Sequence, residues 1–297
     1  MNKIIACPLC NESKTGKLFS VTDYLLSKES FDLLKCEACG FIFTSDPPSP
    51  DAIGSYYKSE DYISHSDTTE GFFNRVYHLV RKIMLSKKYN LIKHYSGTNK
   101  GSILDIGCGT GYFPGYMKNK GWSALGIESD KRASAYASSK FGLDILEMDD
   151  IMSMPAEKFD AVTLWHVLEH LYEPSVTLSM ADRILKEDGA LIIALPNNAS
   201  FDARNYGAKW AAWDVPRHLW HFNQESFSRL VSGTGFEITT VRRMPFDVFY
   251  VSVLSEQNQG KRLAFIRGII SGSIGWILSL FNKSESSSLI YVLKKKP

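Results

Sequence analysis

Two pairs of cysteines have the spacing that can bind a metal ion. Cys7 and Cys10 form one C-x-x-C pair, and Cys36 and Cys39 form the second. Two thiolates three residues apart can contact one side of a tetrahedral ion, and a second pair can close the other side. We therefore predict a zinc ribbon over the first 50 residues. Its zinc would be structural, because four sulfur ligands leave no open coordination position. The alternative is four unrelated buried or redox-active thiols.

A glycine-rich loop marks a second candidate site. A short apolar strand is predicted at Ile103–Ile106; it runs into Gly107, Gly109 and Gly111, and a helix is predicted from about Tyr112. Glycines let the chain turn sharply and let a ligand approach the backbone closely. The spacing is G-x-G-x-G, and the third glycine of a dinucleotide-binding G-x-G-x-x-G would fall on Tyr112. The loop therefore departs from that fingerprint.

Acidic residues follow the next two predicted strands. The second strand, Ser123–Ile127, ends at Glu128, which suits hydrogen bonding to the hydroxyls of a ribose. The third strand, at about 144–147, precedes Asp149 and Asp150. Either aspartate could lie near an adenine amino group, and the alternative is that both are solvent-exposed loop residues.

These residues together resemble the class I S-adenosylmethionine (SAM)-dependent methyltransferases. Leu104–Gly111 (LDIGCGTG) is similar to the first motif of that family, and Glu128 matches its ribose-binding acid. Phe159–His170 and Gly189–Pro196 resemble its fourth and fifth strands. The resemblance implies an α/β fold: a Rossmann-like seven-stranded sheet, mostly parallel, with helices on both faces. It also implies SAM as cofactor, S-adenosylhomocysteine as product, and a contact of Asp105 with the methionine end of SAM. The expected cofactor-binding residues are Asp105, Gly107, Cys108, Gly109, Gly111, Glu128, Asp149 and Asp150.

The zinc ribbon and a second motif, Asp214-x-Pro-Arg-His218-x-x-His221-Phe222, together indicate a narrower group within the methyltransferases that the sequence resembles. It is similar to bacterial methyltransferases associated with cell-surface sugar or lipid biosynthesis. We expect three domains or segments: a zinc ribbon at 1–50, a linker and covering helix at 51–100, and the methyltransferase domain at 101–297. An apolar helical insert is expected at about 246–283.

Histidines gather in the loops that would follow the fourth and fifth strands. The candidate catalytic residues are His166, Glu169, His170, His218 and His221. If the acceptor is a hydroxyl, a base must remove its proton, and histidine is suited to that near neutral pH. We favour His166 or His218 as the residue that faces the acceptor, and each histidine could instead be structural.

The same histidines raise the question of a second metal. The segment His166-Val-Leu-Glu169-His170 with His218 or His221 could bind a divalent ion. Some class I families that methylate catechols or RNA ribose bind such an ion with an E-x-x-E-H loop. Because this sequence has His166 where those have Glu, a second, catalytic divalent metal is the less favoured interpretation.

Three residues before and within the same motif are candidates for binding the acceptor. Trp213 could stack on a sugar face or an apolar ring, and Asp214 could supply a polar contact. Arg217 could pair with a phosphate or carboxylate of the acceptor. The aromatic residues could equally form the core of a lid.

An apolar stretch near the end, Leu263–Phe281, is almost long enough to span a bilayer. A single crossing would leave the predicted seventh strand, at about 288–294, on the far side of the membrane from its sheet. We therefore expect membrane-surface contact or a homodimer through about 261–283, where basic residues surround the stretch. The alternative is an ordinary buried helix beside a solvated basic tail. No secretory signal is recognised, so we expect a cytoplasmic protein, peripheral at the inner membrane face if the stretch meets lipid.

The distribution of charge limits the class of substrate. The chain has 297 residues and a net charge of +2, but residues 101–254 carry 14 Lys or Arg against 19 Asp or Glu, a net −5. A nucleic-acid groove needs local positive charge, so nucleic acid is disfavoured as a partner. The favoured function is SAM-dependent methyl transfer to a small molecule: a sugar, a lipid-linked sugar or a related metabolite. The alternatives are an RNA methyltransferase with a zinc recognition module and a non-catalytic SAM-binding scaffold.

Overall fold

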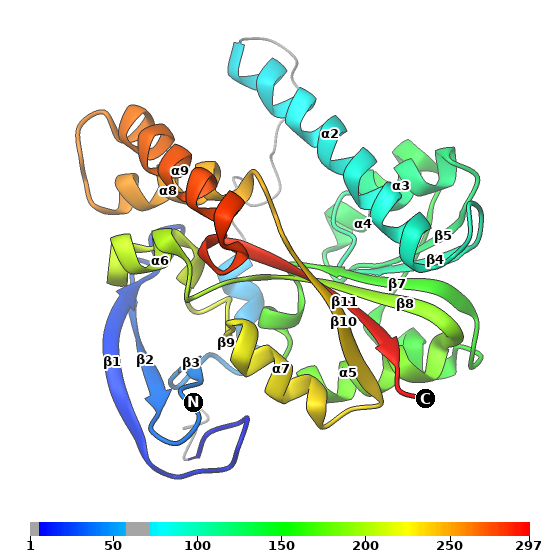
Figure 1. Cartoon of the computed structure of the whole chain (residues 1–297), viewed down its shortest axis with the longest axis horizontal. Coiled ribbons are helices and arrows are strands. Elements are labelled where there is room, and N and C mark those ends of the chain that lie inside the picture. Colours follow the sequence, from blue (N-terminus) through cyan, green and yellow to red (C-terminus); the bar gives the residue numbers. More distant parts are fainter. Residues whose placement is uncertain (1–5, 58–71) are drawn as a thin grey trace.

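Two β-sheets of different size form the framework of the molecule. The structure is a computed structural model that describes residues 6–57 and 72–297. The larger sheet has the strand order β10-β11-β8-β7-β4-β5-β6, and the smaller has the order β1-β2-β3-β9 (Figure 1). The strands of the larger sheet are β4 (Ser102–Ile106), β5 (Ser123–Ile127), β6 (Asp144–Leu146), β7 (Phe159–Trp165), β8 (Leu185–Pro196), β10 (Phe236–Arg243) and β11 (Ser288–Lys295). Those of the smaller are β1 (Thr15–Thr22), β2 (Ser30–Cys36), β3 (Ile42–Thr44) and β9 (Trp220–His221).

The central strands of the larger sheet run parallel. β4 pairs in parallel with β5 and β7, β5 with β6, and β7 with β8. Only the two outer pairings, of β11 with β8 and with β10, are antiparallel among the described strands of this sheet. The prediction of a Rossmann-like seven-stranded sheet is therefore confirmed. The carboxyl ends of β4, β5 and β7 meet at one edge, which is where open α/β sheets bind ligands.

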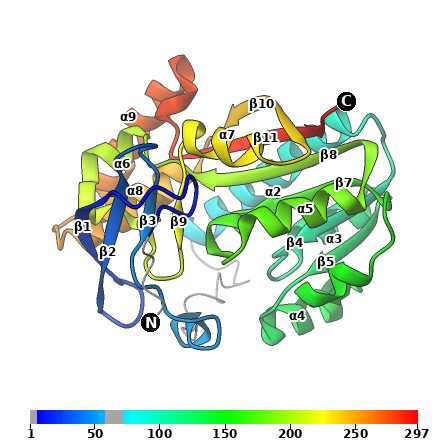
Figure 2. The same cartoon turned by 90° about the horizontal axis from the view of Figure 1, so that it is seen from below.

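Helices cover both faces of this sheet (Figure 2). Side chains of α2 and α3 form one hydrophobic cluster with it, and side chains of α5 and α7 form another on the opposite face. Residues 191–195 of β8 are all buried, as expected for a strand that is covered on both sides. The helices are α2 (Phe72–Tyr95), α3 (Tyr112–Asn119), α4 (Lys131–Phe141), α5 (Pro174–Ile184), α6 (Phe201–Tyr206), α7 (Gln224–Ser232), α8 (Asp247–Asn258) and α9 (Ala264–Phe281).

Short 3-10 turns connect several elements and carry many of the candidate site residues. They are η1 (Ile53–Tyr57), η2 (Met148–Ser153), η3 (Leu168–His170), η4 (Gly207–Lys209), η5 (Ala211–Trp213) and η6 (Lys283–Glu285). Of these, η3 follows β7 and η5 precedes the motif that leads into β9.

The N-terminal ribbon shares a sheet with a distant part of the chain. Strand β9 pairs antiparallel with β3, so that Phe43 lies opposite Trp220. Phe41 stacks on Trp220 and also contacts Phe222, which joins the ribbon to the main hydrophobic core. Residues 1–5 of the expected ribbon and 58–71 of the expected linker lie outside the described residues.

The insert between β10 and β11 is a pair of packed helices, α8 and α9. Three glycines of α9, at Gly268, Gly272 and Gly275, are buried against α8. A Cβ at Gly268 would lie 2.5 Å from the Cα of Val253, so only glycine permits this approach. Helix α9 is also the one helix among the described residues that is long and apolar enough to cross a membrane.

A buried ion pair fixes the ribbon to the rest of the molecule. The Arg217 Nη2 atom lies 2.9 Å from Asp23 Oδ1, and both side chains are at most 1% exposed. The same guanidinium donates to the carboxylate of Asp214 and to the carbonyl oxygen of Tyr56. The expected contact of Arg217 with the acceptor is therefore replaced by a structural role, because its donors are already occupied.

We expect the substitution Arg217→Met to lower the free energy of unfolding by about 3–5 kcal/mol, since it leaves Asp23 buried without a counter-charge. Urea denaturation would measure the change. Lys17→Ala is the matched control in the ribbon, because Lys17 pairs with Asp32 at the surface, and it should cost less than about 1 kcal/mol. Equal effects of the two substitutions would contradict the assigned role.

Candidate active site

The glycine loop after β4 forms an open cradle. Gly107, Gly109 and Gly111 have φ angles of 69°, 54° and 77°, in the left-handed region that favours glycine. Gly111 is the N-cap of α3. A Cβ at Gly109 would meet nothing within 4 Å, whereas one at Gly107 would lie 2.5 Å from Val167 Cγ2. Gly109 therefore faces open space, and Gly107 brings the glycine loop against the loop that follows β7.

The carboxylate of Glu128 lies beside this cradle. Glu128 Oε2 accepts a hydrogen bond from the Gly109 N–H at 2.7 Å, and Oε1 accepts one from the Asp130 N–H at 2.9 Å. Asp150 is held by η2, where its Oδ2 accepts from the Glu147 N–H at 2.9 Å, and Asp149 is exposed. All of these residues follow β5 or β6 at the edge expected for a nucleotide; the adenine contact of either aspartate stays a prediction.

Asp105 is buried under the cradle. Thr163 Oγ1 donates to its Oδ1 at 2.6 Å. Burial raises the pKa of Asp105 to about 7, while the Thr163 hydrogen bond and the charge of Lys88 act in the opposite direction. Cys108, next in the loop, is a packing residue: its Sγ would lie 2.6 Å from a Cβ at position 126, and burial raises the pKa of its thiol.

Lys88 is a site residue that the sequence pattern did not reveal. It belongs to α2, and its Nζ lies over the ring of Trp165 at 4.0 Å. Burial lowers the pKa of Lys88 to about 8, against the attraction of Asp105 and Asp247. The sequence does show a lysine among the apolar residues of a predicted covering helix. Without the fold, however, a lysine that faces the site cannot be distinguished from one at the surface.

His166 lies between two carboxylates after the end of β7. Its Nε2 is 3.0 Å from Asp247 Oδ2, and its Nδ1 is 3.5 Å from Glu169 Oε1. Burial alone would lower the pKa of His166, but the two carboxylates outweigh it and raise the pKa to about 10. A protonated ring has no lone pair for a proton, so this geometry does not suit His166 as a base. Asp247, the first residue of α8, was not predicted from the sequence.

His170 and His218 lie next to one another and to Glu169. Their ring centroids are 4.5 Å apart, and His218 Nε2 is 3.9 Å from Glu169 Oε1. His218 Nδ1 lies 2.9 Å from the carbonyl oxygen of Ala212, and His170 Nδ1 lies 3.1 Å from that of Arg217. Burial and the neighbouring His218 lower the pKa of His170 to about 4. The structure thus brings together four of the five predicted catalytic residues, His166, Glu169, His170 and His218.

His221 and Trp213 lie away from this group and have structural contacts. His221 Nε2 is 3.0 Å from Thr44 Oγ1 within the ribbon interface, and burial lowers the pKa of His221 well below its usual value. Trp213 packs edge-on against Phe19 and donates from Nε1 to the Gly207 carbonyl oxygen at 2.8 Å. These contacts explain why both aromatic rings are buried rather than open to an acceptor.

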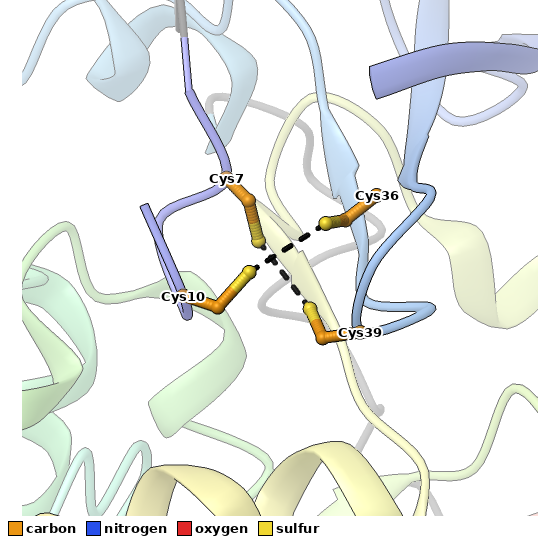
Figure 3. A group of neighbouring side chains, drawn as sticks. All are labelled: Cys7, Cys10, Cys36 and Cys39. Carbon is orange, nitrogen blue, oxygen red and sulfur yellow. Dashed lines mark hydrogen bonds between the residues drawn. The ribbon is translucent and has the colours of Figure 1, made fainter. Parts of the chain in front are cut away.

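The four cysteines of the ribbon converge on one point (Figure 3). Cys7 Sγ and Cys39 Sγ are 3.6 Å apart, as are Cys10 Sγ and Cys36 Sγ, and all four sulfur atoms lie within 4.8 Å of one another. A tetrahedral Zn²⁺ with bonds of about 2.3 Å places its sulfur ligands about 3.8 Å apart. The donor set and its spacing therefore fit a closed zinc site.

A parallel α/β sheet with a glycine loop and an acid at the end of its second strand is an arrangement typical of nucleotide-binding folds. The profile of a methyltransferase domain family matches residues 81–241, more than half of the chain. The chain belongs to this methyltransferase domain family.

Similar proteins are methyltransferases of several kinds. A human mitochondrial ubiquinone biosynthesis O-methyltransferase is 28% identical over 163 residues, 50% of this chain and 44% of that protein. A probable SAM-dependent methyltransferase of Mycolicibacterium smegmatis is 22% identical over 141 residues, 46% of this chain and 52% of that protein. The chain spans about half the length of the curated relatives it matches. The structure of geranyl diphosphate C-methyltransferase from Streptomyces coelicolor A3(2) has a TM-score of 0.52 at 10% identity, covering 80% of this chain and 90% of that one.

We expect SAM affinity to fall as the pH drops from 7 to 5.5. Above pH 7 the Asp105 carboxylate is ionised and can pair with the cationic ammonium of SAM, and below it the carboxylate is protonated. The α-amino group of SAM titrates near 8, so the effect is confined to the lower range. Calorimetric titration at several pH values would measure it, and Asp105→Asn should bind weakly with little pH dependence over this range. An unchanged affinity in the native protein would contradict the role of Asp105.

Proposed function

We propose that the protein transfers a methyl group from SAM to a small-molecule acceptor, which is a sugar, a lipid-linked sugar or a related metabolite. The observation that carries this proposal is the contact of two loops at one sheet edge. The glycine loop, with Asp105 and Glu128, is suited to the cofactor, and the His166–His170 loop, which touches it through Val167, is suited to the acceptor.

The residues of the chain would have distinct roles. Bound SAM supplies an activated methyl group on a positively charged sulfur. Glu128 can exchange its backbone partners for the ribose hydroxyls, and the free space at Gly109 leaves room for the cofactor. Asp105 would hold the ammonium of the methionine end, and Lys88 on α2 would partly balance the negative charges of Asp105 and Asp247. Alignment of the acceptor with the methyl group then provides most of the rate enhancement.

A hydroxyl acceptor would lose its proton on the side of His170 and His218. Both Nδ1 atoms face carbonyl oxygens, which can only accept, so each Nδ1 carries a hydrogen and each Nε2 keeps a lone pair. Of the two residues that the sequence favours, His218 is therefore the better candidate for the base, and His166 is better suited to an electrostatic role.

Two observations support a small-molecule acceptor. The curated relatives include proteins named as ubiquinone biosynthesis O-methyltransferases, from human and from Xanthomonas species. The acidic charge of residues 101–254 disfavours a nucleic-acid groove. We also propose that Zn²⁺ in the ribbon is structural and stabilises the strand pairing of β3 with β9.

Incubation with methyl-labelled SAM and fractionated cell extract would test the proposal. We expect label in the small-molecule or lipid fraction rather than in RNA. Glu128→Gln should weaken SAM binding about 10- to 100-fold, because it weakens charge-assisted hydrogen bonds worth about 1.5–3 kcal/mol. Asp144→Asn is the matched control, since Asp144 is an exposed acid on neighbouring β6. Label in RNA, or SAM binding without transfer to any fraction, would contradict the proposed function.

A further inference from the structure

The carboxylate of Glu169 is buried without a hydrogen-bond partner. Its side chain is 1% exposed, and within the described part of the chain neither Oε1 nor Oε2 accepts a hydrogen bond. The nearest cation, His166, lies 3.5 Å away and is shared with Asp247. A buried carboxylate in this state carries a large desolvation cost, which a hydrogen-bond donor or a cation would have to offset.

Two imidazole rings lie beside this carboxylate, each with a ring nitrogen within 4.8 Å of a Glu169 oxygen. His218 donates its Nδ1–H to Ala212 and so keeps a lone pair on Nε2, which lies 3.9 Å from Glu169 Oε1. His170 donates its Nδ1–H to Arg217, with the Tyr57 hydroxyl also 3.0 Å from Nδ1. Ring nitrogens fixed in this way by backbone carbonyl oxygens are typical of metal-binding histidines. Three acceptors converge, and the one cation that faces the carboxylate among the described residues, His166, lies 3.5 Å from it and is shared with Asp247.

We propose that Glu169, His170 and His218 form a binding site for a divalent transition-metal cation. One ligand atom from each side chain lies within 4.8 Å of the other two. Bonds of about 2.1 Å would draw these atoms to roughly 3.4 Å, which requires only a small movement of the rings. One carboxylate and two imidazoles suit Zn²⁺, Mn²⁺, Co²⁺ or Fe²⁺ rather than Ca²⁺, which prefers oxygen ligands. Three ligands leave an open position for an acceptor oxygen.

The site deepens the proposed function, and it rests on that function only for the role of the ion. The ion would bind an acceptor hydroxyl and lower its pKa, so that the proton leaves to water before the oxygen attacks. The O–H bond breaks, the O–CH₃ bond forms, and the sulfur of SAM keeps the electron pair of the broken S–CH₃ bond. The two histidines would then act as ligands rather than as bases.

Metal content per chain tests the site without SAM or acceptor. The full-length protein, loaded with Zn²⁺ and desalted, should hold two zinc ions per chain, one of them in the cysteine ribbon. Glu169→Gln and His218→Gln should each hold one, with affinity at the second site lowered by roughly 100-fold or more. One ion in the native protein, after loading at saturating Zn²⁺, would overturn the inference and leave the proposed methyl transfer standing.

The matched control is His166→Gln, which changes a neighbour of Glu169 that is not a proposed ligand. It should still hold two ions, because it removes a competing cation. If His166 were the only counter-charge that Glu169 needs, the native protein would hold one ion and Glu169→Gln would change nothing. Retention of the ribbon zinc, with unchanged circular dichroism, shows that each variant is folded.

A separate observation concerns the outer face of α9. Its apolar side chains are on the side opposite the glycines that pack on α8. Ile266, Ile270 and Ile274 are each about half exposed, and only 22% of the helix is buried. Leu263, Phe265, Ile269, Ile277, Leu278, Leu280 and Phe281 are the other exposed apolar residues of this region.

The charges around this apolar face indicate what kind of surface it contacts. Lys261 and Arg262 precede the helix and Lys283 follows it, and all three are exposed. Within the helix, Arg267 pairs with Glu256 of α8 at 2.8 Å. Cations at both ends of an apolar face about 27 Å long match a bilayer surface with anionic headgroups, whereas the same cations on a second copy would repel each other. We infer that α9 lies in the plane of an anionic membrane, since β11 follows it and must return to the sheet.

Vesicle co-sedimentation tests this inference. The protein should bind vesicles that contain phosphatidylserine and bind neutral phosphatidylcholine vesicles at least tenfold more weakly. Ile270→Glu with Ile274→Glu should abolish binding, and Val176→Glu, at an exposed apolar site on α5, should not. The inference fails if no vesicle binds, or if the double variant only dissolves a dimer seen by analytical ultracentrifugation.

Discussion

The pairing of β9 with β3 is the contact on which the proposed acceptor side of the site, the His166–His170 loop with His218, depends. The ribbon has too few residues to form a large core of its own, so it buries Phe41 and Phe43 against Trp220 instead. Immediately before β9, the carbonyl oxygen of His218 accepts from Thr44 Oγ1 at 2.7 Å. The backbone of His218 is therefore held by the ribbon while its ring faces Glu169. A structural change at the cysteine cluster would therefore be transmitted to His218 through the pairing of β3 with β9.

The cofactor side is coupled to the acceptor side by close packing rather than by charge alone. Gly107 has no side chain because Val167 occupies that space. Val167 is also the residue between His166, which has a φ of 57°, and the turn that carries Glu169. A movement of either loop would require the other to shift. The fold therefore fixes the proposed cofactor loop and the proposed acceptor loop relative to one another through a contact between two short loops.

Local patterns in the sequence were enough to predict the sheet, the glycine loop, the ribbon and most of the residues near the site. Chemistry that depends on long-range contacts was not predictable. Arg217 has the residue type of a phosphate ligand, but its partner Asp23 is 194 residues away and changes its role. Lys88 lies on α2 and Asp247 on α8, and no sequence motif predicts that these two helices pack against the site. His221 looked equivalent to His218, yet the alternation of a strand places it against Thr44.

Charges of alternating sign run across the site from one loop to the other. Lys88 is attracted to both Asp105 and Asp247, and His166 lies between Asp247 and Glu169. Three carboxylates with two cations leave a net negative charge in a region of low dielectric, where such an imbalance is costly. A cationic cofactor beside Asp105 would reduce it at one end, and a metal ion at Glu169 would reduce it at the other. Because Asp247 begins α8, the helix pair that carries the apolar face is tied directly to this series of charges.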